Sequence, residues 1–459
     1  MKKVKRMALQ TLAIIASVCF LASCSGKGYT NAIPQNANAV MQIDFSKADG
    51  QQVLPISKET VKLLLPAEKA EDCGIDFKHK IFLFTTDNGN MGLCAKTDDK
   101  DKLTDLLEKM AKSGQSSRPI ERRGYTFALI NNSWAVGISD EATVVTGPIL
   151  PAQMAEATRT LTNWLKQDEE HSVTETPLFD RLKDKEDAAV LVARGDALPQ
   201  QLAALLTIAK PKDADNSEIY ITATLEKKDN TYLNICAETT ADNENLKNAL
   251  AVQTQKMRPI GKRFLDCAPS DALCSVFTNM QGTEFLDMIH ASKELGVMLA
   301  GANTAVDMDN ILRSVDGNML TCIKSYSADS PSLSIAAKLK DCNFLKDIDY
   351  WKKSCKAGAS LETLSPNTFA YRSENASFWF GISKEKEFYG STELVLAPGI
   401  LSKTMQPLPA SLLKEAEGSR FAVVINLKEL LCSGNDNATT QSLAEPLLGG
   451  IQYILYTIK

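Results

Sequence analysis

The chain has 459 residues, 44% of them hydrophobic and 23% charged, and a formal net charge of −5. The acidic balance argues against a nucleic-acid partner, because clustered basic side chains bind the phosphate backbone. The apolar content excludes a disordered chain, and the length suggests two to three domains.

The first 23 residues predict an export signal. Four basic residues stand within the first six positions, and the following stretch 12–22 is almost wholly apolar. This stretch is about half as long as the roughly 20 residues of a membrane-spanning helix, so it is typical of a signal peptide. Removing four of the 51 basic residues and none of the 56 acidic ones changes the formal net charge from −5 to about −9.

Cys24 follows Leu21-Ala22-Ser23, a run that resembles the lipobox of bacterial lipoproteins. In that pattern the cysteine thiol is acylated and Cys24 becomes the new N-terminus. The alternative is an ordinary secretory signal with a cysteine near its end by chance. We expect a signal peptide over 1–23, lipidation of Cys24 and a polar tether over 24–32, with stable anchoring because several acyl chains hold more firmly than one. Ser25 in place of Asp implies the outer membrane in that pattern, on either the periplasmic face or the cell surface.

Further along the chain, three stretches share a pattern of strand, turn, strand and helix: 80–110, 218–250 and 318–351. Their strands alternate apolar and polar residues, which is typical of a sheet with one buried face. Breaker residues mark the turns, as in Asp87-Asn88-Gly89 and Asp229-Asn230. Each stretch therefore predicts a hairpin followed by a helix.

The helices of these stretches carry apolar residues at positions i, i+3, i+4 and i+7, so we expect them to cover a sheet. Asp98 or Asp99 can cap the first helix. The apolar face of that helix comprises Leu103, Leu106, Leu107 and Met110.

Two hairpins, starting at Tyr125 and Asn367, match in their residues. Both contain Thr-Phe-Ala, a turn with Asn, and then Gly-Ile-Ser. A short strand running into a helix also recurs, and the order of these elements predicts duplicated halves over about 33–165 and 266–415. The final segment 451–458 matches the first strand of a repeat, so it should pair with a sheet already built. The matched triplets are Thr126-Phe127-Ala128 with Thr368-Phe369-Ala370, and Gly137-Ile138-Ser139 with Gly381-Ile382-Ser383.

Strands joined by tight turns predict an α+β fold of mostly antiparallel sheets with helices on one face, internally duplicated into two similar lobes. We expect a first α+β repeat over 33–165, a connecting partial repeat over 166–262, and a second α+β repeat with a C-terminal strand over 263–459.

The common phosphate-binding, zincin and hydrolase motifs are absent from the sequence. Ser383 and Lys386 fit Ser-x-x-Lys, but they lie in a predicted hairpin and read as a solvated strand end. His79, His171 and His290 stand far apart, so neither a catalytic triad nor a metal site is expected. We predict no catalytic residues, no metal site and no cofactor.

Nine cysteines follow Cys24, an odd number with no Cys-x-x-Cys, so neither a complete disulfide framework nor a zinc knuckle is supported. Most should be small buried residues. The alternative for two of them is a disulfide between Cys267 and Cys274.

Trp134 and Trp379 lie on the matching hairpins and are the residues we single out as ligand contacts, since aromatic side chains there would stack on a sugar or line a groove. The alternative is core packing, because alternation puts Trp379 on one face of its strand and Phe378 and Phe380 on the other. A sheet packed on both sides would show the same pattern.

The lipobox, the segment "AIPQNANAVMQIDF", the Gly-Ile-Ser hairpins and the length together resemble an uncharacterised family of Bacteroides-type lipoproteins, catalogued as a domain of unknown function. In that group, acidic residues after the lipidated cysteine are associated with display on the cell surface, and residues 25–28 lack them. We expect a lipid-anchored, non-enzymatic binding or scaffold protein of the cell envelope, attached to the membrane through its N-terminal lipid and binding a protein or glycan partner. The alternative is a hydrolase that acts on envelope or extracellular glycans through a pair of carboxylates.

Overall fold

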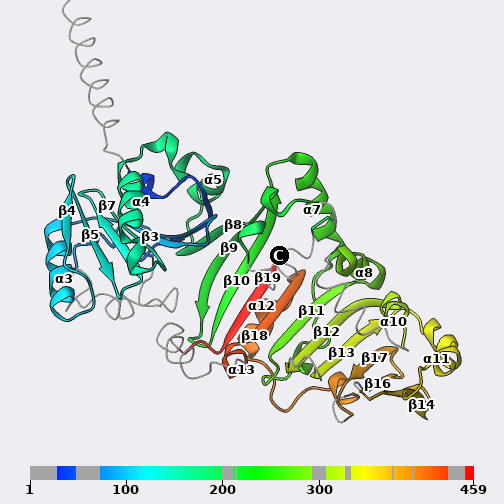
Figure 1. Cartoon of the computed structure of the whole chain (residues 1–459). Coiled ribbons are helices and arrows are strands. Elements are labelled where there is room, and N and C mark those ends of the chain that lie inside the picture. The colour runs from blue at the N-terminus through cyan, green and yellow to red at the C-terminus, as the bar shows by residue number, and fades with distance from the viewer. Residues whose placement is uncertain are drawn as a thin grey trace, which may run out of the picture. The chain divides into compact units, whose positions relative to one another are not determined.

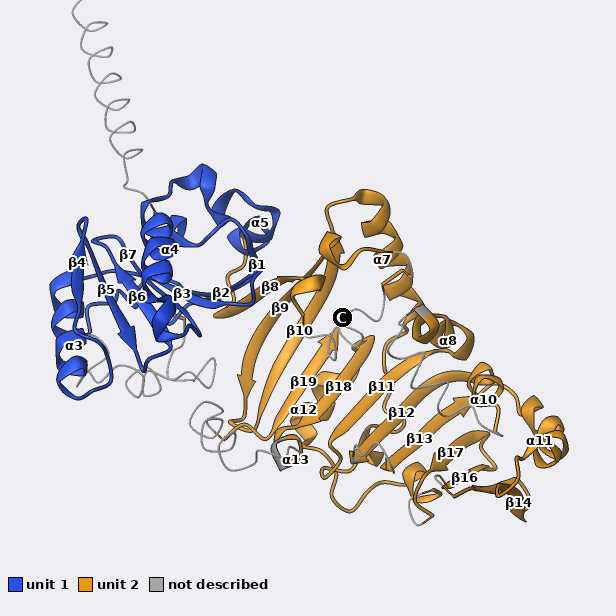
Figure 2. Ribbon diagram, viewed as in Figure 1, with its two compact units in different colours: residues 1–45, 64–183 blue, residues 46–63, 184–459 orange. Residues whose placement is uncertain are grey.

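The computed structural model describes residues 28–47, 73–198, 210–211, 214–291, 306–325, 332–374, 377–394, 397–432 and 450–459. The chain divides into two compact units (Figure 2). Unit 1 comprises Met1–Phe45 and Leu64–Lys183, and unit 2 comprises Ser46–Leu63 and Asp184–Lys459. The predicted signal peptide and Cys24 lie outside the described residues.

Unit 1 is built on an antiparallel sheet with the strand order β1-β2-β3-β7-β6-β5-β4 (Figure 2). Its strands are β1 (Ala37–Ile43), β2 (Ile81–Thr86), β3 (Met91–Lys96), β4 (Ile120–Arg122), β5 (Tyr125–Ile130), β6 (Trp134–Ile138) and β7 (Ala142–Gly147). Its helices are α3 (Lys100–Lys112), α4 (Met154–Lys166) and α5 (Pro177–Lys183), with the 3-10 turns η1 (Tyr29–Ala32), η3 (Pro151–Gln153), η4 (Glu169–His171) and η5 (Val173–Glu175).

Helix α3 forms where the sequence predicts it. The Asp99 carboxylate accepts a hydrogen bond from the backbone N–H of Lys102 at 3.0 Å and so caps the helix. The four apolar residues of the predicted face are all buried in one core cluster. The turn before β3 also follows the prediction, since Gly89 adopts a φ of +80° there.

Helices cover both faces of the unit 1 sheet, so the prediction of helices on one face is wrong for this unit. Val136 and Ile138 of β6 pack in the core cluster of α3. Gly137, between them, lies against Leu161 of α4. Because successive residues of a strand point to opposite faces, α3 and α4 lie on opposite sides of the sheet.

Unit 2 is built on a longer sheet with the order β8-β9-β10-β19-β18-β11-β12-β13-β17-β16-β15-β14 (Figure 1). Among the pairs of this order that the structure describes, β10 and β19 are parallel and the others antiparallel. The strands are β8 (Ala189–Arg194), β9 (Ile219–Lys228), β10 (Tyr232–Ala241), β11 (Cys274–Gln281), β12 (Val315–Ser325), β13 (Ser332–Leu339), β14 (Ser360–Ser365), β15 (Thr368–Arg372), β16 (Ser377–Ile382), β17 (Glu387–Ser391), β18 (Phe421–Asn426) and β19 (Tyr453–Ile458).

The helices of unit 2 also pack on both faces of its sheet. Phe277 of β11 lies in a core cluster with Leu412 of α12 (Ala410–Ala416), whereas Met280 lies in a cluster with Met288 of α8 (Gly282–Ala291). The other helices are α7 (Glu244–Lys256), α10 (Met308–Arg313), α11 (Ile348–Ser354) and α13 (Leu427–Cys432), with η6 (Gly195–Ala197), η7 (Asn216–Glu218), η8 (Leu265–Cys267), η9 (Asn343–Asp347) and η10 (Gly399–Leu401).

The final strand follows the prediction, because β19 pairs with β18 on one side and β10 on the other. The order β11-β12-β13-β17-β16-β15-β14 in unit 2 also repeats the order of the unit 1 sheet, position for position. The fold is therefore α+β and mostly antiparallel. The residue limits predicted for the repeats stay a prediction.

The two matching hairpins are β5-β6 and β15-β16, but their cross-strand register differs by one residue. Gly137 faces Phe127, whereas Gly381 faces Thr368 and not Phe369.

The described part of the chain holds no helix both long enough and apolar enough to span a bilayer.

Candidate functional site

The two tryptophans singled out from the sequence belong to different units and pack into the protein. Trp134 begins β6 and its ring crosses the backbone of Gly147, where an added Cβ would come within 2.8 Å of it. Trp379 is half-buried against the core cluster that contains Phe277, while Phe378 and Phe380 pack in a cluster on the opposite face. These positions fit the packing alternative.

Each histidine has an aspartate beside it. The imidazole nitrogen of His79 is 2.8 Å from the Asp76 carboxylate and that of His171 is 2.6 Å from Asp168. His290 lies 3.6 Å from Asp309. Within the described residues, no cluster of three or more His, Cys, Asp or Glu side chains has the arrangement of a metal site.

The eight cysteines whose side chains the structure describes are free thiols, so Cys267 and Cys274 do not form a disulfide. Burial raises the pKa of Cys274 to about 11 and that of Cys322 to about 12. Burial also raises the pKa of Cys267. Because the thiolate is the nucleophile, a raised pKa lowers the reactivity of these three side chains at neutral pH.

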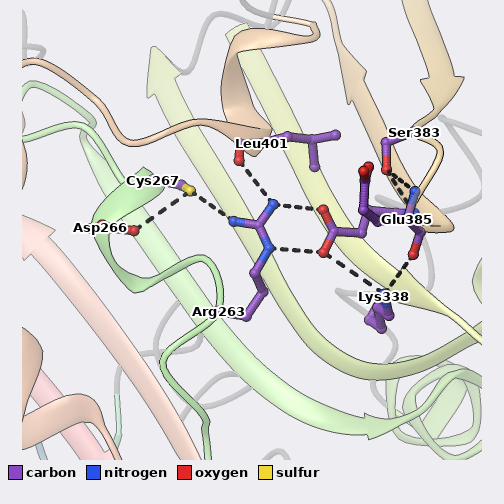
Figure 3. A network of polar contacts seen from close by, with 8 residues as sticks. Arg263, Asp266, Cys267, Lys338, Ser383, Glu385 and Leu401 are labelled. Atoms are coloured by element: carbon purple, nitrogen blue, oxygen red, sulfur yellow. Dashed lines mark hydrogen bonds and ion pairs between the residues drawn. The ribbon is translucent and has the colours of Figure 1, made fainter.

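Arg263 and Glu387 form a bidentate ion pair in unit 2 (Figure 3). Arg263 precedes η8, and its Nε and Nη2 donate to Oε1 and Oε2 of Glu387 at 2.8 and 2.6 Å. Nη2 also donates to the carbonyl of Leu401 at 2.9 Å, and Nη1 points at the sulfur of Cys267 at 3.7 Å. The Glu387 side chain is only 9% exposed. The pair therefore fastens the segment before η8 to the first residue of β17.

Lys338 and the turn between β16 and β17 complete this network (Figure 3). Lys338 stands opposite Glu387 in the sheet, with its Nζ 4.0 Å from Oε1 of Glu387 and donating to the carbonyl of Glu385 at 2.6 Å. The Ser383 hydroxyl accepts hydrogen bonds from the backbone N–H groups of Glu385 and Glu387. Ser383 thus stabilises a turn, as its place in a predicted hairpin indicates.

The electrostatics of the network suit a structural clamp. Hydrogen bonds from Arg263 lower the pKa of Glu387, and the same bonds raise the pKa of Arg263. Both groups are therefore charged at neutral pH and neither is poised to exchange a proton. The pair positions the loop and offers no acid, base or nucleophile to a substrate.

An open polar pocket of about 320 Å³ lies in unit 1, where the turn between β2 and β3 meets the N-terminal half of α4. We call it the α4 pocket. Thr146 of β7 and Ala157 of α4 form part of its floor, and both are buried. The lining residues are Asn88, Asn90, Thr146, Pro148, Ile149, Gln153, Glu156, Ala157, Thr160 and Trp164.

Several polar groups of the α4 pocket are not used within the described structure. The amide oxygen of Asn88 accepts from Thr86 and from the N–H of Asn90, and that of Gln153 accepts from the N–H of Leu150, which leaves both amide NH₂ groups to donate. The side chains of Asn90, Glu156 and Thr160 have no hydrogen bond or ion pair among the described residues.

Trp164 closes one side of the α4 pocket. Its ring meets that of Phe84 edge to face, with centroids 5.7 Å apart and planes at 74°. This site was not predicted from the sequence, where Trp134 and Trp379 were the expected ligand contacts. The signal was the spacing of Gln153, Glu156, Thr160 and Trp164, which puts three polar side chains and one aromatic ring on a single helix face.

Comparison with known proteins identifies a family for this chain. The model of the family described as Domain of unknown function (DUF4836) matches residues 57–417, and no curated protein matches the chain. Crystal form I of TP0453 is similar at 10% identity and a TM-score of 0.30, over 50% of this chain and 88% of that one. Crystal form III of TP0453 gives 11% and 0.28, over 45% and 77%. Similarities this low give no information about function.

Proposed function

We propose that this chain, which belongs to the DUF4836 family, is a lipid-anchored protein of the cell envelope that binds a partner without catalysing a reaction. The observation that carries the proposal is the contrast between the Arg263–Glu387 network and the α4 pocket. The groups around Arg263 and Glu387 satisfy one another, whereas the side chains of Asn90, Glu156 and Thr160 in the α4 pocket have no partner among the residues that the structure describes. A pocket of unused hydrogen-bonding groups with no activated nucleophile suits binding.

The anchor is proposed at Cys24, which the lipobox-like sequence supports. Residues 29–32, within the predicted tether, form η1 and are fastened to unit 1. The hydroxyl of Tyr29 donates to the carbonyl of Lys80 at 2.7 Å, and Gln167 donates to the carbonyl of Ile33 at 2.9 Å. Five residue steps separate Cys24 from Tyr29, so the lipid would hold unit 1 within about 18 Å of the membrane.

Internal duplication is part of this proposal. The shared order of seven strands in the two sheets supports it, because strand order survives changes of sequence that erase residue identity. The recurrence of Thr-Phe-Ala and Gly-Ile-Ser at the same two strands of each sheet supports it further. Two related sheets would offer a binding protein two independent surfaces.

The first experiment compares the wild-type chain with Cys24→Ala in cells fed a labelled fatty acid. We expect label and membrane fractionation for the wild type, and neither for the variant. An unlabelled wild-type chain in the soluble fraction would refute the anchor. Protease treatment of intact cells, with a periplasmic protein as the protected control, then decides between the periplasmic face and the cell surface.

The hydrolase alternative needs a carboxylic acid whose pKa is raised and a second carboxylate about 5–10 Å away. Where the surroundings shift the pKa of a described carboxyl group, the shift is downward, as in Asp76, Asp168, Asp215 and Glu387. Glu156 is the single carboxylate among the described residues that line the α4 pocket. These observations favour binding over hydrolysis at the α4 pocket.

A further inference from the structure

We propose that the α4 pocket binds one uncharged sugar ring of a glycan. This inference rests on the binding role proposed above and names the chemical class of the ligand. A pyranose ring has a rim of hydroxyl groups, which both donate and accept hydrogen bonds, and C–H faces that pack on aromatic rings. The pocket must therefore offer both kinds of polar partner and an aromatic wall.

The lining residues supply donors and acceptors side by side. The NH₂ groups of Asn88 and Gln153 are left to donate, because their amide oxygens are already used within the protein. The Glu156 carboxylate only accepts, and the Thr160 hydroxyl does both. Asn90 adds a further amide with no partner among the described residues. Two adjacent hydroxyl groups of a sugar therefore meet both a hydrogen-bond donor and an acceptor in the α4 pocket.

Trp164 supplies the aromatic wall. It is half-buried at the C-terminal side of the pocket, one helical turn beyond Thr160. The edge-to-face contact with Phe84 fixes the orientation of its ring without a ligand. A preorganised ring lowers the entropy cost of binding.

Charge and size narrow the ligand class. None of the lining residues in the described chain is Lys, Arg or His, and Glu156 would repel a phosphate, sulfate or carboxylate. The lining is too polar for a lipid chain, which would leave these amides and the carboxylate unsatisfied. A volume of about 320 Å³ lies at the lower end of the range for small-molecule pockets, about 300–1,000 Å³, and its open side leaves room for the rest of a glycan.

The matched pair of variants is Asn90→Ala and Asn163→Ala. Asn90 lines the pocket, whereas Asn163 lies exposed on α4 outside the lining and serves as the control for an asparagine side chain lost from the same unit. Glu156→Gln removes the charge and keeps the shape of the side chain. All three positions are on the surface or half-exposed, so each variant should fold, which its melting temperature verifies.

The experiment measures binding of the methyl pyranosides of glucose, galactose, mannose and N-acetylglucosamine to the detergent-solubilised full chain by saturation-transfer NMR. We expect at least one of them to bind with a Kd on the order of 1 mM. Asn90→Ala and Glu156→Gln should raise that Kd about fivefold to tenfold, and Asn163→Ala should leave it unchanged.

Two results would overturn the inference: no binding of any of the four sugars, or binding that is equally strong in Asn90→Ala, Glu156→Gln and Asn163→Ala. The proposed binding role is tested separately, by cross-linking in the envelope followed by reconstitution with the purified partner. If the chain binds a purified envelope protein but none of the four sugars, the proposed binding role stands and the proposed sugar ligand is refuted.

Discussion

Replacing Arg263 by Met tests whether the ion pair with Glu387 clamps unit 2. The substitution keeps most of the alkyl stem and removes the guanidinium, which leaves the Glu387 carboxylate without its two short hydrogen bonds. Breaking a fully buried pair costs about 3–5 kcal/mol, and an exposed pair is worth about 0–1 kcal/mol. The Glu387 side chain is 9% exposed and the Arg263 side chain 38%, and Lys338 compensates part of the positive charge lost with Arg263. We therefore expect a loss of about 2 kcal/mol in the free energy of unfolding of unit 2.

The assay is urea denaturation followed by tryptophan emission in a Trp134→Phe, Trp164→Phe background. The fluorescent side chains that stay are Trp351 and Trp379, both in unit 2, and Trp379 packs on the core cluster that the segment around Arg263 covers. Emission then reports the unfolding of unit 2 alone, which matters because a chain of two units need not unfold in one step.

A double-mutant cycle with Glu387→Gln isolates the pair. The single substitutions should cost about 2 and about 1 kcal/mol, and the double substitution about 1 kcal/mol less than their sum. A coupling energy near zero would refute the clamp, since each residue would then act through other contacts.

The pair also predicts the pH dependence of unit 2. The folded-state pKa of Glu387 is lowered below the ordinary value of 4.5, so its contribution is fully present above that pH. It is lost as the pH falls through the lowered pKa. The stability difference between wild type and Glu387→Gln should therefore be constant from pH 5 to 7 and shrink in more acidic solution, and a difference that grows on acidification would contradict the assignment.

Three further predictions concern other positions. Gly381→Ala should destabilise unit 2 by about 1–3 kcal/mol, because its Cβ would lie 2.6 Å from the backbone carbonyl oxygen of Asn367, while Gly399→Ala, with nothing within 4 Å, should be nearly neutral in the same denaturation assay. Lys386→Gly should stabilise the turn before β17 by about 0.5–1 kcal/mol, because Lys386 has a φ of +57°, whereas Lys384→Gly should not; equal effects would refute the strain argument. Iodoacetamide at pH 8 should label the half-exposed Cys342 and Cys355 before the buried Cys94 and Cys322, with peptide mass spectrometry as the readout.

Local features were predictable because a few neighbouring residues determine them. The α3 face and its Asp99 cap follow from helical spacing, and Asp229 and Asn230 adopt the left-handed φ values of +51° and +52° that their turn requires. The placement of β19 was predictable because its sequence matches the first strand of a repeat. In each case the signal lies within about ten residues.

The Arg263–Glu387 pair and the α4 pocket were not predictable, because each joins distant parts of the chain. The two partners of the ion pair are 124 residues apart, and one of them sits in an irregular segment with no periodicity to read. The α4 pocket needs the Asn88 turn and the α4 helix to meet, which depends on the order of strands in the sheet. Helices on both faces were missed for a related reason: a strand buried on both sides loses the alternation that distinguishes its faces.

The insertion of β19 between β10 and β18 fixes when unit 2 can be completed during synthesis. Strands β8 to β10 and strands β11 to β18 are joined through the backbone of residues 453–458, so a nascent chain that stops short of them leaves two unpaired strand edges in the middle of the sheet. Unit 1, whose strands lie before residue 148, has no such requirement. The two units should therefore become resistant to protease at different times as the chain is delivered from its N-terminus, unit 1 before β19 has emerged and unit 2 only afterwards.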